Sequence, residues 1–358
     1  MWRSFGLRSV GHRTLHFSRV AIYFGRMTVM TEPKAVAPRV RRAGWSLGST
    51  CPFGCKHCYT AVSRSTAGEI TVEQIHHVID TFTRLGVESV VLGGNEPIYA
   101  GSSEPKTSLL PLIIDSLVAA DIKPILITSG LTTRFLQMHF AEKIPLLAAM
   151  VISLDSPNAD DHNANRGAPL FEIARQANHT GAEHGVPTLV CVTPTRANFT
   201  PDSLRGFVEL AHEWDALLRM NTYKSASGLD DPQAVTVEQY WDGFGYLVDQ
   251  CTTLVVDEPP LFPWFDRTAP PNCGRSSIRV GFPTLQGEIP ITPCQYRPEL
   301  GSHGYGGPME PPPERNRLCI DYLAYGDPPF TPTSARVDRS PTADLFTDYL
   351  CTWIGQPT

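Results

Sequence analysis

The stretch Cys51-Pro-Phe-Gly-Cys55-Lys-His-Cys58-Tyr59 places three cysteines within eight residues, at the spacing C-x3-C-x2-C. Three thiolates this close can bind one soft metal centre, either zinc or an iron–sulfur cluster. A zinc site normally has a fourth Cys or His at matching spacing, and His57, between two of the thiols, points poorly for that role. Three cysteines leave one iron of a [4Fe–4S] cube without a protein ligand, so a small molecule can bind there and accept an electron.

This loop resembles the signature of the radical S-adenosylmethionine (SAM) superfamily, in which an aromatic residue, here Tyr59, follows the last cysteine. The resemblance implies that Cys51, Cys55 and Cys58 hold a [4Fe–4S] cluster whose open iron chelates the amino and carboxylate groups of SAM. It also implies cleavage of SAM to methionine and a 5′-deoxyadenosyl radical, which abstracts hydrogen from a substrate. The alternative is a structural zinc knuckle or chance spacing.

The composition is that of a globular protein, with 358 residues, 42% hydrophobic and 18% charged. A net charge of −6 gives no reason to expect a nucleic-acid partner. No run of about 18 apolar residues predicts a membrane span. Nine cysteines in a chain this long do not indicate a secreted disulfide scaffold, and an oxygen-labile cluster needs a reducing compartment, so we expect the cytoplasm.

Residues 1–31 differ from the rest of the chain. They contain five arginines and several serines, and the first acidic residue is Glu32. This composition fits a mitochondrial transit peptide, which would place the protein in the matrix, or an upstream start codon ahead of Met27 or Met30. We expect residues 1–31 to lie outside the fold in either case.

From Trp45 onward, short β-like runs alternate with amphipathic helical runs. Six such repeats in one direction predict a parallel sheet with right-handed crossovers. The expected fold class is therefore α/β, a partial (β/α)6 TIM-like barrel with a small C-terminal β-hairpin and irregular Fe–S extension, and the resemblance implies the same barrel. We expect strands at 45–50, 87–92, 124–128, 150–154, 188–193 and 217–223, and helices at 72–85, 109–120, 133–142, 171–184 and 201–213. The expected domains are a barrel over 44–224, a bridging segment over 225–271 and the extension over 272–358.

Gly93-Gly94-Asn95-Glu96-Pro97 closes the second predicted strand. Two glycines allow backbone to come close to a ligand. The segment resembles the Gly-Gly-Glu-Pro motif of the family, which hydrogen-bonds the methionyl ammonium of SAM, but Asn95 interrupts the motif. Whether Asn95 or Glu96 faces the ligand therefore stays open, and the alternative is a plain turn.

Further SAM contacts are expected where the third and fourth strands end. Ser129, in Thr-Ser-Gly, could bind the ribose, as the equivalent family segment does. Ser153 and Asp155 share one face of their strand, toward the barrel lumen if Ile152 and Leu154 face the helices. Arg166 resembles a family arginine that contacts the SAM carboxylate, and the alternative is a solvated arginine at a helix start.

Strands five and six supply candidate catalytic residues. Cys191 lies mid-strand, where a buried free cysteine is the commoner interpretation and a hydrogen-atom donor is the alternative. Arg219, Asn221 and Tyr223 alternate along strand six and could line a substrate cavity, and Lys224 could join them.

A second group of cysteines begins at Cys273. Cys273 and Cys294 flank two β-like runs joined by a Gly-containing turn, which predicts a hairpin with both thiols at its open end. The segment resembles the start of the auxiliary-cluster (SPASM or twitch) extension, which implies a second [4Fe–4S] cluster completed by Cys319 and Cys351. Cys351 is expected in a helix over 343–354, and Cys251 is its rival. The alternatives are unliganded thiols or a zinc site.

We therefore expect a radical SAM enzyme that acts on a small molecule, natural-product-like or sugar-like, with an electron donor such as flavodoxin or ferredoxin as partner. A peptide-modifying maturase is the first alternative, although the chain lacks room after residue 30 for a leader-binding domain of roughly 80 residues. A non-enzymatic Fe–S or zinc scaffold is the second. The substrate itself is not readable from the sequence.

Overall fold

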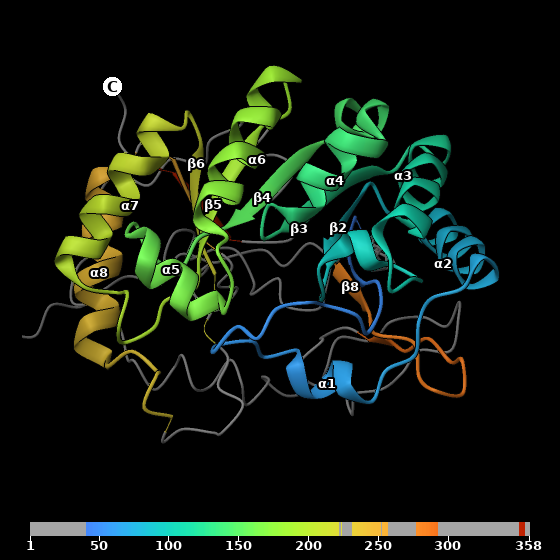
Figure 1. The fold of residues 1–358 in the computed structure, drawn as a ribbon, viewed down its shortest axis with the longest axis horizontal. Coiled ribbons are helices and arrows are strands. Elements are labelled where there is room, and N and C mark those ends of the chain that lie inside the picture. The colour runs from blue at the N-terminus through green and yellow to red at the C-terminus, as the bar shows by residue number, and fades with distance from the viewer. Residues whose placement is uncertain are drawn as a thin grey trace, which may run out of the picture. The chain divides into compact units, whose positions relative to one another are not determined.

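The computed structural model describes residues 41–221, 223, 231–251, 253–256, 277–292 and 351–354. In these ranges the chain forms one curved sheet whose strands run side by side, with helices packed along its outer face (Figure 1). The strands are β1 Arg42–Ser46, β2 Ser89–Gly93, β3 Lys123–Thr128, β4 Ala149–Ser153, β5 Thr188–Val192, β6 Leu217–Met220, β7 Thr253–Val256, β8 Ser277–Val280, β9 Ile291–Thr292 and β10 Cys351–Ile354.

The helices alternate with the strands as the hydrophobic periodicity predicts. They are α1 Ala61–Ser65, α2 Val72–Leu85, α3 Leu110–Ala119, α4 Leu131–His139, α5 Ala159–Arg166, α6 Phe171–Glu183, α7 Pro201–Glu213 and α8 Val237–Gln250, with short 3-10 turns at Pro97–Tyr99, Pro105–Thr107 and Ala141–Leu146. Local signals fix their ends. The α2 helix begins with a capping box between Thr71 and Gln74 and ends at Gly86, which has a left-handed backbone (φ 72°).

The sheet order is β10-β7-β6-β5-β4-β3-β2-β1-β8-β9. Strands β1 to β8 are parallel to their neighbours within this order, whereas β9 and β10 are antiparallel to β8 and β7. The α/β half-barrel is confirmed, but it has eight parallel strands rather than six. The additional strands come from the predicted bridge (β7) and the predicted hairpin (β8), which join opposite edges of the sheet.

Two predictions about the C-terminal part need correction or completion. Cys351–Ile354 is a strand paired with β7, so the prediction of a helix over these residues is wrong: its backbone pairs with a strand far away in the sequence, which local periodicity cannot show. The predicted hairpin is confirmed in the backbone of β8 and β9. Its flanking Cys273 and Cys294, and also Cys319 and Lys224, lie outside the described residues, as does all of 1–31.

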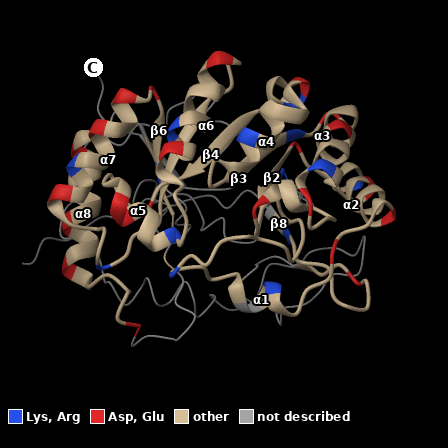
Figure 2. Ribbon diagram, viewed as in Figure 1, with Lys and Arg blue, Asp and Glu red and all other residues tan. Residues whose placement is uncertain are grey.

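Hydrophobic side chains fill both faces of the sheet. The outer face packs against the helices in two clusters, one around α2 and α3 and one around α7 and α8. The inner face carries a smaller layer, to which Val91, Val151, Cys191 and Val255 belong. Charged residues of both signs are interspersed over the helices (Figure 2). No helix among the described residues has the length and apolar character needed to cross a membrane.

Candidate functional site

The cysteine loop follows β1, at the edge where the parallel strands end. Cys51, Cys55 and Cys58 are half-buried and form no disulfide. Burial raises the pKa of Cys55 to about 11, although the nearby guanidinium of Arg166 acts to lower it. The charges of Cys58 and Cys51 add to the rise. The three thiols are therefore close enough for the charge of one to disfavour ionisation of another.

The imidazole beside the thiols is engaged with other residues. His57 Nδ1 lies 2.8 Å from Asn165 Nδ2, and His57 Nε2 lies 3.6 Å from Asp155 Oδ1. Among the residues that the structure describes, no three side chains of His, Cys, Asp or Glu are placed to hold a metal ion. His57 is therefore not placed to act as the fourth ligand of a zinc ion.

The turn after β2 is tied to the cysteine loop at both ends of that loop. Thr60 Oγ1 donates to the Gly94 carbonyl (2.8 Å), and Asn95 Nδ2 donates to the Thr50 carbonyl (3.0 Å). The other side-chain atom of Asn95, Oδ1, is buried with no hydrogen-bond partner. Asn95 therefore faces the cysteine loop.

The side chain of Glu96 does not face the cysteine loop but lies against the turn between β3 and α4. Its carboxylate, which is buried, accepts hydrogen bonds from the backbone amides of Ser129 (3.0 Å) and Thr132 (2.9 Å) and from the hydroxyls of Thr128 and Thr132. These bonds join the turn after β2 to the turn between β3 and α4. The carboxylate of Glu96 is therefore engaged within the fold, whereas the side chain of Asn95 lies against the cysteine loop.

The two glycines of the β2 turn differ. Gly93 is two residues beyond Val91 on the same face of β2, so a Cβ there would point to the inner face, 3.5 Å from Ile127 Cβ. Gly94 has a φ of 87°, and a Cβ would lie 2.7 Å from Ser46 Oγ. Gly94 is thus required by the backbone itself, whereas a Cβ at the buried Gly93 would make only an ordinary contact with Ile127.

Glu69 also shapes the loop, although no sequence motif points to it. Its Oε1 accepts hydrogen bonds from the backbone amides of Ser49 (3.1 Å) and Thr50 (3.0 Å). A Cβ on Gly48 would lie 2.3 Å from the other carboxylate oxygen, so glycine allows this close approach. A single acidic residue between two elements carries no signal of such a contact.

A buried ion pair stands behind Cys55. Arg166 Nη2 donates to Asp155 Oδ1 (2.7 Å), Arg166 Nε lies 2.6 Å from Asp155 Oδ2, and Arg166 Nη1 lies 3.9 Å from Cys55 Sγ. Asn165 Nδ2 donates to Asp155 (2.7 Å), and His57 Nε2 is 3.6 Å from it. Burial favours a higher pKa for Asp155, but Arg166 and His57 outweigh it and hold the pKa at about 2. The alternative of a solvated helix-start arginine is wrong, because Arg166 is buried at the C-terminal end of α5.

A second guanidinium reaches the loop from α1. Arg64 Nη2 lies 3.6 Å from Cys58 Sγ, and Thr60 Oγ1 lies 3.3 Å from the same sulfur. Burial alone would raise the pKa of Cys58, but the hydrogen bonds from Thr60 and Arg64 lower it. Cys58 is thus the loop thiol that most readily becomes a thiolate. Sequence reasoning missed both Arg64 and Thr60.

Three predicted residues form one row across the inner face. Ser153 pairs with Cys191, and Cys191 pairs with Arg219, in the register of β4, β5 and β6. Directly paired residues of parallel strands point to the same side, so these three side chains share the inner face. Cys191 and Arg219 are buried.

Asn221 and Tyr223 lie beyond this row. Strand β6 ends at Met220, so the predicted alternation through Tyr223 is wrong: the chain leaves the sheet after Asn221, whose amide donates to the Val192 carbonyl (2.7 Å). Tyr223 donates to Asp231 (2.7 Å), and burial together with this carboxylate raises the pKa of the phenol.

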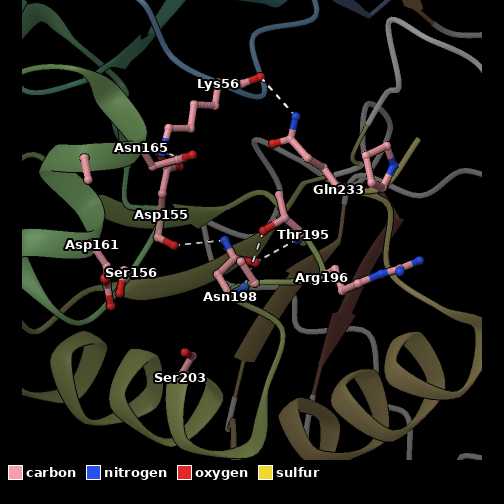
Figure 3. A pocket seen from close by; sticks show the side chains of 13 residues that line it. Lys56, Asp155, Ser156, Asp161, Asn165, Thr195, Arg196, Asn198, Ser203 and Gln233 are labelled. Carbon is pink, nitrogen blue, oxygen red and sulfur yellow. Dashed lines mark hydrogen bonds between the residues drawn. The ribbon is translucent and has the colours of Figure 1, made fainter.

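A cavity of about 490 Å³ opens beside the cysteine loop (Figure 3). Asn198 forms its floor, where its Nδ2 donates to the carbonyls of Asp155 (2.9 Å) and Thr193 (3.0 Å). Lys56, from the loop, forms its opposite wall and accepts a hydrogen bond at its carbonyl from Gln233 Nε2 (3.4 Å). The lining residues are Lys56, Asp155, Ser156, Asp161, Ala164, Asn165, Thr195, Arg196, Ala197, Asn198, Ser203, Pro232 and Gln233.

A second buried cysteine outside the loop, besides Cys191, lies at the end of α8. Cys251, the proposed rival of Cys351, is buried at the end of α8 in the hydrophobic cluster around α7 and α8, and burial raises its pKa to about 12. A thiol in this setting acts as a small apolar side chain.

Comparison with known proteins agrees with this geometry. Residues 45–211 match the radical SAM superfamily. The chain is 27% identical over 210 residues to the mycofactocin maturase MftC of Mycolicibacterium smegmatis, covering 57% of this chain and 50% of MftC. It is 25% identical over 225 residues to the AdoMet-dependent heme synthase of Nitratidesulfovibrio vulgaris, covering 60% of this chain and 57% of the synthase. It is 25% identical over 143 residues to the subtilosin biosynthesis protein AlbA of Bacillus subtilis, covering 40% of this chain and 30% of AlbA.

The chain spans about half the length of the first two of these relatives. Among solved structures, histidine-tagged anSMEcpe with bound AdoMet superposes with a TM-score of 0.55 at 14% identity, covering 72% of this chain and 74% of that one. This likeness shows the fold. A [4Fe–4S] cluster and SAM are what this family implies. Residues 45–211 form a radical SAM domain.

Proposed function

We propose that Cys51, Cys55 and Cys58 hold the family's [4Fe–4S] cluster and that SAM binds on the inner face of the sheet beside Gly93. The observation that carries this proposal is the placement of three half-buried thiols, free of disulfides, at the C-terminal edge of the parallel strands. When bound, the cluster and SAM supply a 5′-deoxyadenosyl radical. The chain's own residues fix the loop (Thr60, Asn95), and the buried carboxylate of Asp155 orients Arg166.

Gly93 offers a direct test of the SAM site. We expect Gly93→Ala to lower SAM affinity about tenfold, the equivalent of about 1.4 kcal/mol, because a methyl group on the inner face would occupy the space of the bound molecule. The strand itself should tolerate the change, since the added Cβ meets Ile127 at an ordinary contact distance of 3.5 Å. Equilibrium dialysis with labelled SAM on the iron-loaded protein measures the affinity. Unchanged affinity at full iron content would show that SAM does not approach Gly93.

For the substrate we propose a small polar molecule bound in the cavity between α5, the loop after β5 and the cysteine loop. Its volume lies within the range of roughly 300–1,000 Å³ that small-molecule sites occupy. Ten of its thirteen lining residues carry polar or charged side chains, which could orient a polar ligand by hydrogen bonds. The row of Ser153, Cys191 and Arg219 lies on the inner face, and we propose that it contacts the reacting part of the substrate.

Filling the cavity should leave the cleavage of SAM intact but prevent substrate from stimulating it. Ala164 is exposed on α5 and lines the cavity, whereas Ala159 is exposed on the same helix and does not. We expect Ala164→Trp to keep the slow cleavage of SAM that occurs without substrate. A low-molecular-mass extract of the source cells should stimulate SAM cleavage at least about tenfold less in this variant than in the wild type, because the indole fills the binding space. Ala159→Trp should respond as the wild type does. Full stimulation of Ala164→Trp would place the substrate elsewhere.

A peptide-modifying maturase is the second candidate, favoured by the similarity to the mycofactocin maturase and to the subtilosin biosynthesis protein. The same assay separates the two candidates. Stimulation of SAM cleavage only by the peptide fraction that an ultrafiltration membrane retains would favour the maturase.

We also propose a second [4Fe–4S] cluster at Cys273, Cys294, Cys319 and Cys351, and an external one-electron donor such as flavodoxin or ferredoxin.

A further inference from the structure

Two arginines contact the thiols of the cysteine loop, one from each side. Arg166 Nη1 lies 3.9 Å from Cys55 Sγ, and Arg64 Nη2 lies 3.6 Å from Cys58 Sγ. A hydrogen bond or a positive charge at a cluster thiolate is one of the means by which a protein tunes the reduction potential of an iron–sulfur cluster. The two guanidinium groups are not equivalent, because their other partners differ.

The charge of Arg166 is cancelled close by. Asp155 Oδ1 and Oδ2 lie 2.7 and 2.6 Å from the guanidinium nitrogens, and both residues are buried. Seen from the sulfur of Cys55, the two opposite charges form a dipole whose field falls off faster than that of a single charge. Arg166 therefore fixes the position of the loop more than it changes the charge around it.

The charge of Arg64 is not cancelled in this way. Its Nε donates to Thr60 Oγ1 (3.3 Å) and its Nη1 donates to the Ser49 carbonyl (3.3 Å), both neutral groups. None of the ion pairs between residues that the structure describes includes Arg64. These two bonds hold a full positive charge beside Cys58, and Thr60 itself contacts the same sulfur.

We propose that Arg64 is a positioning residue that raises the reduction potential of the cluster at the cysteine loop, by donating to the Cys58 thiolate. This inference rests on the proposed function, since it takes the cluster to bind at these three cysteines. Reduction transfers one electron from an external donor, with no proton, and adds one negative charge to the cluster and its thiolates. A cation fixed next to one thiolate stabilises the more negative form and so makes reduction easier.

The test is a potentiometric titration followed by EPR on the anaerobically reconstituted full-length protein. The signal that changes when SAM is added identifies the cluster at the loop, as distinct from any second cluster. We expect Arg64→Gln to make reduction about tenfold less favourable, which for one electron corresponds to a midpoint about 59 mV more negative. Arg64→Lys keeps the charge and should shift the midpoint less than Arg64→Gln does.

The matched control is Arg175→Gln, which removes an equal charge from the exposed face of α6, where Arg175 pairs with Glu172. Its midpoint should equal that of the wild type. If Arg64→Gln binds no iron, Arg64→Met takes its place, because it also removes the charge while keeping an unbranched side chain, and a midpoint of Arg64→Met equal to that of the wild type would refute the proposal. A midpoint of Arg64→Gln equal to that of Arg175→Gln would also refute it, whereas a wild type without a SAM-sensitive signal would refute the proposed function instead.

Discussion

Alanine at Cys51, Cys55 and Cys58 together is expected to abolish the formation of 5′-deoxyadenosine from SAM and dithionite. These residues are the three thiols of the loop after β1, and the hydrogen bonds of Thr60 and Asn95 that hold this loop would remain without supplying a ligand for iron. Without thiolates the cluster has no protein ligands, so SAM has no source of the electron that its cleavage requires. Chromatography of the products after anaerobic reconstitution measures the loss.

The matched control is Cys251→Ala, which removes a thiol from the hydrophobic cluster around α7 and α8 and should keep SAM cleavage near the wild-type rate. Product formation by the triple variant at a rate above the buffer background would contradict the assignment of the three cysteines. The iron content of the same variant also tests the proposed second cluster. About four irons should remain per chain if that cluster exists, and replacing Cys273 and Cys294 as well should remove them.

Replacing Asp155 should have the largest effect on stability. The carboxylate is buried, contacts Arg166 at 2.6 and 2.7 Å and accepts a hydrogen bond from Asn165 at 2.7 Å. Asp155→Asn would leave the guanidinium of Arg166 buried without a counter-charge, which costs about 3–5 kcal/mol of unfolding free energy in comparable cases. Urea denaturation of the metal-free chain at pH 7 measures the loss. Asp160→Asn, an exposed position in the first turn of α5, should change the same quantity by less than about 1 kcal/mol.

The effect of Asp155→Asn should depend on pH in a defined direction. The pKa of Asp155 is about 2 in the folded chain, below the value of roughly 3.9 for an unfolded aspartate. The unfolded state therefore takes up the proton first, so the stabilisation by Asp155 is fully present above about pH 4 and is lost as the pH falls toward 2. The difference between wild type and variant should narrow over this interval. A difference that stays constant from pH 7 to pH 3 would show that the charge of Asp155 does not stabilise the fold.

Much of the barrel follows from local sequence. The α2 and α7 helices lie at the predicted residues, and the first six strands lie within a few residues of the predicted runs, because hydrophobic periodicity, capping residues and glycine stops act over a few positions. The spacing of the three loop cysteines is likewise a local property, and the family comparison agrees with what it implied.

The tertiary structure alone decided which distant groups meet. That β7 and β8 add to opposite edges of the sheet, and that Cys351–Ile354 is a strand, depends on pairing between segments far apart in the chain. Arg64 beside Cys58, Glu96 beneath the turn after β3, and Asp155 against Arg166 follow from the way strand ends converge. A residue type and its spacing determine what a loop can bind, but the charges and hydrogen bonds that surround a bound group come from segments that only the folded chain brings together.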